Sequence, residues 1–163
     1  MGSVYFKPSS EFLAKATEVF EQQRVKLIKL MPYSDIQQVG STAIPNSITK
    51  GDLDIVVRVP VDKFTSATEV LKSSYKINQP ENWSKIFASF KDEDNLGIDF
   101  GVQLVIKDSR SDDFIKLRDV LRNNPQLVED YNAMKLKYEG KNMDDYRKEK
   151  ADFFQKLREK FAE

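Results

Sequence analysis

Apolar residues recur with helical spacing near the start of the chain and with strand spacing soon after it. From about residue 10 to residue 30 they return every three or four positions, which predicts a long amphipathic helix that ends before Pro32. Residues 36–40 predict a short strand, and residues 53–59 predict a longer one with a β-branched run. Between them, residues 40–51 are rich in Gly, Ser, Thr, Pro and Asn, which is the composition of a loop.

The remaining pattern gives strands first and helices afterwards. The expected elements are a helix at 63–73, strands at 75–77, 83–91 and 97–106, a hairpin turn at 91–95, and helices from 114, from 125 and over 144–161. This order predicts an α+β fold, in which a mixed β-sheet is flanked by helices and followed by a C-terminal helical segment. We expect a single domain over residues 1–163, with a core at about 10–107 and a helical part at about 110–161.

The composition narrows the chemistry that this fold can carry. The chain has no cysteine and no histidine, which excludes disulfides, thiolate zinc sites and a histidine base. A metal ion must then be held by oxygen ligands, which favours Mg²⁺, Mn²⁺ or Ca²⁺. A general base must be a carboxylate, a lysine or a tyrosine.

The charge balance and the hydropathy argue against two classes of partner. Lys and Arg together number 26, as do Asp and Glu, so the formal net charge is zero and gives no strong signal for nucleic-acid binding. No apolar run approaches the roughly 18 residues that predict a membrane span. The first residues also lack the basic and then apolar pattern of a signal peptide. We therefore expect a cytoplasmic protein whose partner is a small molecule.

Two aspartates at the start of the second strand form a candidate metal site. Residues two apart on a strand point to the same face, so the carboxylates of Asp52 and Asp54 should project together. Neighbouring carboxylates repel each other, and a divalent cation relieves that repulsion. The alternative is that both aspartates simply end a strand and face water.

The loop before these aspartates has the features of a phosphate cradle. Gly40 and Ser41 follow a short strand, where a glycine lets backbone N–H groups approach an anion closely. Ser41 and Thr42 add hydroxyl groups, and Lys50 adds a positive charge. A triphosphate beside a metal needs such a cradle, because phosphoryl chemistry depends mostly on positioning and charge stabilisation.

The combined pattern resembles the signature of the nucleotidyltransferase superfamily, which has a polymerase-β-like fold. In that signature an apolar-Gly-Ser turn is followed, after ten residues, by two aspartates separated by one apolar residue. More narrowly, the chain is similar to the GrpB family over segments 39–45, 50–55, 114–125, 131–135 and 146–154. The resemblance implies that Gly40 and Ser41 bind nucleotide phosphates and that Asp52 and Asp54 bind Mg²⁺ or Mn²⁺.

The resemblance also implies a third carboxylate on a neighbouring strand, for which the sequence offers two positions. Asp99 and Gln103 have the same strand parity, so either side chain could face Asp54. With Asp99 the carboxylate set is complete. With Gln103 the site has two carboxylates and an amide, which binds Mg²⁺ less strongly.

Several other side chains are weaker candidates for the same cleft. Aromatic residues on the strand at 83–91 could stack a nucleobase, although such residues more often belong to the core. Among the C-terminal helices, the candidates for the cleft or for phosphate binding are Arg118, Arg122, Tyr131, Lys135, Arg147 and Lys150. Each could instead have a core or surface role.

These observations lead to two functional hypotheses. The first is a metal-dependent nucleotidyltransferase that transfers a nucleoside monophosphate from a nucleoside triphosphate to an acceptor, with Asp52, Asp54 and Asp99 in the reaction. The second is a nucleotide- or phosphate-binding module of the same fold that does not turn its ligand over. A third possibility is a purely interaction-based role. Some GrpB-like domains are fused to dephospho-CoA kinase, so the resemblance implies a link of either kind of binding protein to coenzyme-A metabolism.

Overall fold

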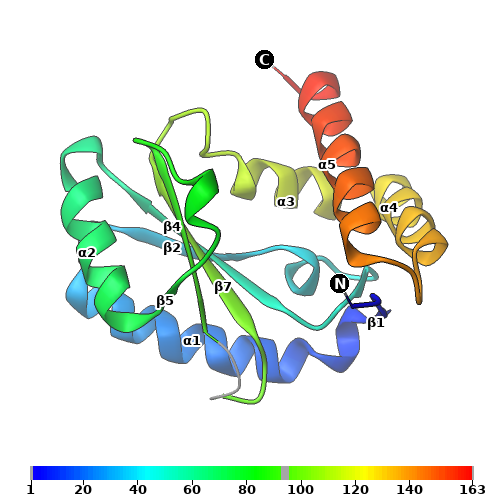
Figure 1. Ribbon diagram of the computed structural model, residues 1–163, viewed down its shortest axis with the longest axis horizontal. Coiled ribbons are helices and arrows are strands. Elements are labelled where there is room, and N and C mark those ends of the chain that lie inside the picture. The colour runs from blue at the N-terminus through cyan, green and yellow to red at the C-terminus, as the bar shows by residue number, and fades with distance from the viewer. Residues whose placement is uncertain (1, 93–95, 163) are drawn as a thin grey trace.

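A five-stranded mixed sheet runs through the middle of the computed structural model, which describes residues 2–92 and 96–162 (Figure 1). Across the sheet the strands are β2 (Asp35–Val39), β4 (Leu53–Val59), β7 (Phe100–Ile106), β6 (Phe87–Asp92) and β5 (Lys76–Ile77). β4 and β7 are parallel, and the other neighbouring pairs are antiparallel. The mixed sheet and its flanking helices confirm the predicted α+β class.

Strand β4 is at the centre of the sheet packing and explains the β-branched run in the sequence. Leu53, Ile55 and Val57 are fully buried on one face, and Val56 is fully buried on the other. A strand covered on both faces has a nearly continuous apolar sequence rather than a simple alternation. The second face also includes two charged residues, Asp54 and Arg58. The layer that covers this face must therefore contain polar groups at these two positions.

The helices cover the two faces of the sheet unequally. α1 (Leu13–Leu30) and α2 (Phe64–Ser74) pack on the face of Leu53 and form the larger hydrophobic core. α3 (Phe114–Arg122) lies on the opposite face, where it contacts the cluster around Val56. Beyond α3 lie α4 (Pro125–Lys137) and α5 (Met143–Lys160), on one side of the molecule in Figure 1.

A second hydrophobic core joins the two ends of the chain. Val4 and Phe6 pack with buried residues of α3, α4 and α5, and the N–H of Val4 donates to the carbonyl of Lys141 at 3.0 Å. The adjoining β1 (Lys7–Pro8) pairs with β3 (Ile48–Thr49), a two-stranded ribbon that the hydrophobic pattern did not predict. This ribbon ties the loop before β4 to the helical side of the molecule.

The structure shifts two of the predicted elements. The first helix begins at Leu13, after a 3-10 turn over Ser9–Glu11 that has no side-chain cap. The strand predicted at 83–91 begins only at Phe87. Of the turn predicted at 91–95, residues 93–95 lie outside the described part of the chain.

The aromatic residues of the β6 region belong to the core. Trp83 lies before the strand, donates from Nε1 to the carbonyl of Asn78 at 3.1 Å, and packs on Phe90 with ring centroids 5.1 Å apart. Phe90 itself is fully buried. These contacts favour the core interpretation over stacking of a nucleobase.

Candidate functional site

The turn after β2 brings Gly40 directly against Asp54. Val39 is paired with Asp54 in the sheet, and Gly40 then adopts a φ of 78°. A Cβ atom added at Gly40 would lie 2.2 Å from Oδ2 of Asp54, so a side chain would collide with the carboxylate as well as strain the backbone. Glycine is therefore required here by both conformation and space.

A second glycine leaves room on the other side of Asp54. Asp54 is paired across the sheet with Gly101 of β7, and a Cβ added there would lie 3.7 Å from Oδ1 of Asp54. The same point lies 3.3 Å from Nε2 of Gln103. The side chains of Asp54 and Gln103 thus converge above Gly101, as their shared strand parity predicts.

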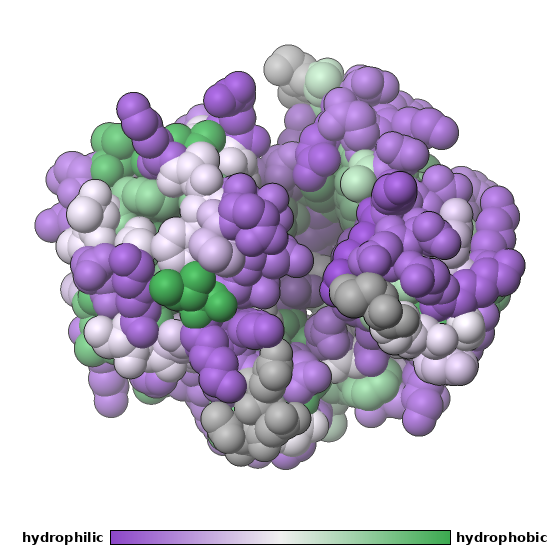
Figure 2. All heavy atoms as spheres, in the orientation of Figure 1, coloured by the Kyte–Doolittle hydropathy of each residue, from purple (hydrophilic) through white to green (hydrophobic). Residues whose placement is uncertain are grey.

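Two cavities meet at the Asp54 carboxylate, where the surface is hollowed between the sheet and the α4–α5 side of the molecule (Figure 2). The larger cavity has a volume of about 250 Å³ and the smaller one about 80 Å³. Ser41, Asp54 and Lys150 line both of them. These three residues therefore mark the junction of the candidate site.

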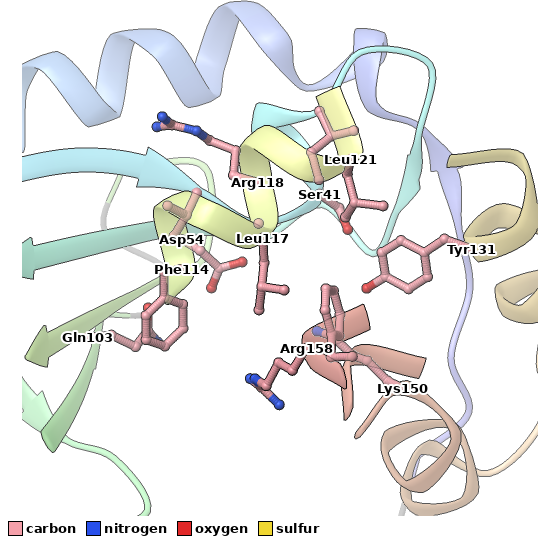
Figure 3. Close-up of a pocket in the computed structure, with 14 residues that line it drawn as sticks. Ser41, Asp54, Gln103, Phe114, Leu117, Arg118, Leu121, Tyr131, Lys150 and Arg158 are labelled. Carbon is pink, nitrogen blue, oxygen red and sulfur yellow. The ribbon is translucent and has the colours of Figure 1, made fainter. Parts of the chain in front are cut away.

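The larger cavity has an apolar wall and a polar floor. Its apolar lining residues come from the Gly40 turn, α3 and α5, and they are Val39, Ile44, Phe114, Leu117, Leu121 and Phe154. Figure 3 shows Asp54 on one side of this space, Lys150 and Arg158 on the other, and Ser41 beside Tyr131. Arg158 and the apolar lining of α3 and α5 were not predicted from the sequence, because nothing in their spacing distinguishes a cavity wall from a core face.

The smaller cavity is almost entirely polar, and half of the predicted site residues line it. Asp52 and Asp54 both line it, which brings the two predicted carboxylates to one space. Lys50 lines it as well, and its Nζ lies 3.1 Å from Oδ2 of Asp52. Lys135 of α4 and Lys150 of α5 also line it, so three amine groups and two carboxylates share this space.

Two of the predicted residues lie outside both cavities. Thr42 is buried and donates from its hydroxyl to the carbonyl of Asp52 at 3.2 Å, so it braces the loop. The side chain of Asp99 is exposed before β7, and its carbonyl accepts from the N–H of Leu53 at 2.9 Å. Within residues 2–92 and 96–162 no three acidic side chains gather into a metal-binding group.

Lys135 has an unusual environment for a lysine. Its side chain is fully buried, and Nζ lies 2.8 Å from Oγ of Ser41 and 2.5 Å from the carbonyl oxygen of Ile48. The amine also lies 3.9 Å from the ring centroid of Tyr131. Lys135 therefore connects α4 to the Gly40–Ser41 turn through its hydrogen bond to Ser41.

The two arginines of α3 hold the backbone of the site. Nη1 of Arg118 donates to Oε1 of Gln37 at 2.9 Å and to the carbonyl of Gln38 at 3.0 Å. Arg122 donates from Nε to the carbonyl of Ala43 at 2.8 Å. Both guanidinium groups are thus occupied by protein acceptors, which favours an anchoring role over phosphate binding.

The family model described as GrpB protein matches residues 11–160 of this sequence, which is most of the chain. The chain belongs to the GrpB family. A UPF0157 protein of Vibrio cholerae is 29% identical over 155 residues, covering 95% of this chain and 82% of that protein. These matches confirm the resemblance that the sequence motifs indicated.

Two solved structures have folds similar to that of this chain. The crystal structure of the conserved protein GrpB from Enterococcus faecalis superposes over 100% of both chains, with a TM-score of 0.71 at 19% identity. The Cid1 poly(U) polymerase bound to MgATP covers 79% of this chain and 42% of its own, with a TM-score of 0.54 at 16% identity. The GrpB fold is therefore similar to that of a nucleotidyltransferase.

Burial moves the pKa values of two groups in this GrpB site toward neutrality from opposite sides. Desolvation raises the pKa of Asp54 from its usual 3.8 to about 6, and the nearby charge of Lys150 opposes this shift. Desolvation likewise lowers the pKa of Lys135 from 10.5 to about 6, and Lys150 and Lys50 add to the effect. Strong shifts of this kind cluster at functional sites.

The donor set fits a hard divalent cation only in part. Asp52 and Asp54 supply carboxylate oxygens to one small cavity, and the raised pKa of Asp54 shows that its negative charge is poorly compensated. Gln103 places its Nε2 3.3 Å from the point where a Cβ on Gly101 would lie. Its Oε1 is buried without a hydrogen-bond partner, so rotation of this amide would offer a third oxygen.

Proposed function

We propose that this GrpB protein binds a nucleoside triphosphate with a divalent cation and transfers its nucleoside monophosphate to an acceptor. The observation that carries the proposal is the junction of the two cavities at Ser41, Asp54 and Lys150. A triphosphate has a compact, highly charged end and a larger, partly apolar end. The small polar cavity suits the first, and the larger apolar cavity suits the second.

The residues of the small cavity would share the charge of the phosphates. The backbone of Gly40 and Ser41 and the amines of Lys50 and Lys150 would hold the β- and γ-phosphates. Asp52 and Asp54 would hold Mg²⁺ or Mn²⁺, with Gln103 as a neutral third ligand. When bound, the cation would neutralise negative charge on the phosphate oxygens.

Asp54 is the residue best placed to accept the proton of the acceptor hydroxyl. It lines both cavities, whereas Asp99, the other predicted carboxylate, lies outside them. A carboxylate with a pKa of about 6 is mostly ionised at pH 7, yet it is a stronger base than an ordinary aspartate. This combination supports Asp54 as the base in the proposed reaction.

Binding without turnover is the second candidate function, and Gln103 is the observation that favours it. An amide occupies the position beside Asp54 where a third carboxylate would complete the site. A neutral ligand contributes less charge to a metal centre than a carboxylate does. The chain would then retain a nucleotide without releasing pyrophosphate.

One pair of measurements tests both candidates. Calorimetric titration with ATP, GTP, CTP and UTP, each with Mg²⁺ or Mn²⁺, reports binding, and a pyrophosphate assay reports turnover. We expect binding and pyrophosphate release in the wild type, loss of release in Asp54→Asn, and no change in Asp62→Asn, whose exposed side chain lies beyond the other end of β4.

Three outcomes separate the possibilities. Binding with release supports the transferase, and binding without release supports the binding module. Absence of binding by every triphosphate at millimolar concentration, with either metal, rejects both.

A further inference from the structure

The hydroxyl of Ser41 lies against a buried base of the same chain. Its Oγ is 2.8 Å from Nζ of Lys135, and it faces both cavities of the site (Figure 3). Lys135 comes from α4, 94 residues away in the sequence, and it is fully enclosed by protein. A fixed hydroxyl beside a buried amine is the arrangement that activates a serine as a nucleophile.

The other partner of the lysine determines which way its hydrogen bonds run. The carbonyl oxygen of Ile48 can only accept, so Lys135 must donate one N–H to it. The amine also donates to Oγ of Ser41 at 2.8 Å. In its neutral form the amine has one lone pair, and turning that lone pair toward Ser41 lets the hydroxyl donate to it. The buried amine is then in position to receive the Ser41 proton.

The charges around Lys135 favour its neutral form. Among the described residues no carboxylate forms an ion pair with its amine. Burial and two neighbouring amines lower its pKa to about 6. The titratable groups that face it across the small cavity or within α4 are Lys50, Asp52, Asp54, Tyr131, Tyr146 and Lys150.

We propose that Ser41 is a nucleophile activated by Lys135, and that it takes the γ-phosphoryl group of a bound nucleoside triphosphate, so that the chain phosphorylates itself. This inference rests on the proposed binding of a triphosphate in the same cavities. There the Gly40–Ser41 turn holds the terminal phosphates, which places the Ser41 hydroxyl beside the γ-phosphorus. The hydroxyl that accepts this γ-phosphoryl group thus belongs to the protein, whereas the acceptor of the nucleoside monophosphate is a separate molecule.

The step balances without any further reactant. Oγ of Ser41 forms a bond to the γ-phosphorus, and the bond from that phosphorus to the β–γ bridging oxygen breaks. The nucleoside diphosphate leaves with that electron pair, and the hydroxyl proton moves to Nζ of Lys135. The resulting ammonium, with Lys50 and Lys150, then stabilises the new phosphoserine.

The modification would also regulate the site. The small cavity has a volume of about 80 Å³, so a phosphate group on Ser41 would occupy the space proposed for the terminal phosphates of the nucleotide. Its negative charge would also repel an incoming triphosphate. The phosphorylated chain is therefore the inactive form, and removal of the phosphate restores nucleotide binding.

Intact-mass spectrometry and peptide mapping test the inference on the full chain, incubated with each triphosphate and Mg²⁺ or Mn²⁺. We expect one phosphoryl group, located on Ser41 and absent from Ser41→Ala. Lys135→Met should slow the modification by at least about a hundredfold, the usual contribution of a general base. Lys137→Met, an exposed lysine of the same helix, should react like the wild type.

Lys135→Arg separates a base from a purely positioning residue. Arginine keeps the N–H donors but is always charged, so it cannot accept a proton near neutral pH. Loss of phosphorylation in Lys135→Arg, with nucleotide binding retained in calorimetry, supports the base. Wild-type phosphorylation in Lys135→Arg, or a phosphoryl group on any residue other than Ser41, overturns the inference.

A reactive probe that needs no nucleotide tests the reactivity of Ser41 independently of nucleotide binding. It therefore separates this inference from the proposed function. A fluorophosphonate should label Ser41 in the wild type and not in Lys135→Met, with thermal unfolding confirming that both are folded. Nucleotide binding without phosphorylation or labelling of Ser41 overturns the inference and leaves the proposed function standing. Absence of nucleotide binding rejects both, even if the probe labels Ser41.

Discussion

The two ends of strand β4 present charged side chains to the same face of the sheet, yet their surroundings are opposite. Near the end of the strand, Arg58 lies 2.7 Å from Asp35 and 2.8 Å from Asp112. At its start, Asp54 forms no ion pair within the described residues and lines two cavities. One charge is paired with carboxylates of the protein, whereas the other is the charge that we propose binds a ligand.

The contrast shows how a structural charge can be told from a functional one. The hydrogen bonds that Arg58 donates to Asp112 raise the pKa of Arg58, which stabilises the ionised form that it already has. Burial raises the pKa of Asp54 and so destabilises its ionised form. Arg58 thus strengthens the fold by fixing the loop before α3, while Asp54 weakens it and supports a site.

Asp54→Asn should give the largest effect on activity and separate the two roles most clearly. The change removes the proposed base and metal ligand but keeps the size of the side chain, so turnover should fall about a thousandfold, or about 4 kcal/mol of barrier. Pyrophosphate release, measured together with urea unfolding, reports both properties. A variant that loses stability along with activity would contradict the assignment of Asp54 to function.

Arg58→Met should have the converse effect on the other end of the strand. Removing the guanidinium leaves Asp112 buried without its main partner, which should lower the free energy of unfolding by about 3 kcal/mol. Urea unfolding measures the loss. Arg24→Met is the control, because Arg24 pairs with Glu21 on the helix surface and should change stability by less than about 0.5 kcal/mol.

The pH dependence of stability should show the shifted pKa values directly. Between about pH 4 and pH 6 the unfolded chain has lost the Asp54 proton and the folded chain retains it, so stability falls as pH rises. Between about pH 6 and pH 10 the unfolded chain retains the Lys135 proton and the folded chain lacks it, so stability rises. A minimum near pH 6 is therefore expected.

Substitutions assign the two limbs of this curve. Asp54→Asn should remove the falling limb, a change of about 3 kcal/mol, and Lys135→Met should flatten the rising limb. Asp62→Asn, at an exposed position, should keep both limbs. A single monotonic curve in the wild type would show that the two groups titrate normally.

The sequence predicted the features of β4 that depend on local pattern. The bounds of the strand at 53–59 agree with the structure, and the parity rule placed Asp54 and Gln103 on one face. The spacing of Gly40 from the aspartates indicated the fold through its resemblance to the nucleotidyltransferase signature. The structure adds the reason for the glycine, which is its close approach to Asp54. Local pattern was sufficient wherever neighbouring residues set the geometry.

Contacts between distant segments could not be predicted in the same way. The hydrogen bond between Lys135 and Ser41 joins residues that are 94 positions apart in the sequence. The position of Lys135 on α4 is equally compatible with a core or a surface role. The pairing of β1 with β3 involves only two residues on each strand, too few for a periodic signal. The partners of Arg58 likewise come from separate elements, so its structural role appears only in the folded chain.

Gln103→Glu should give the smallest effect of these substitutions. It tests whether the Asp54 end of β4 binds a metal ion. A third carboxylate beside Asp54 would add negative charge to the site, so the affinity for Mg²⁺ or Mn²⁺ should rise about tenfold, or about 1.4 kcal/mol. Calorimetric titration with the metal measures the gain, and Gln126→Glu on the exposed face of α4 should leave the affinity unchanged. A tighter metal site with unchanged pyrophosphate release would identify the position of Gln103 as one that tunes binding alone, whereas weaker metal binding would show that this side chain does not reach the cation.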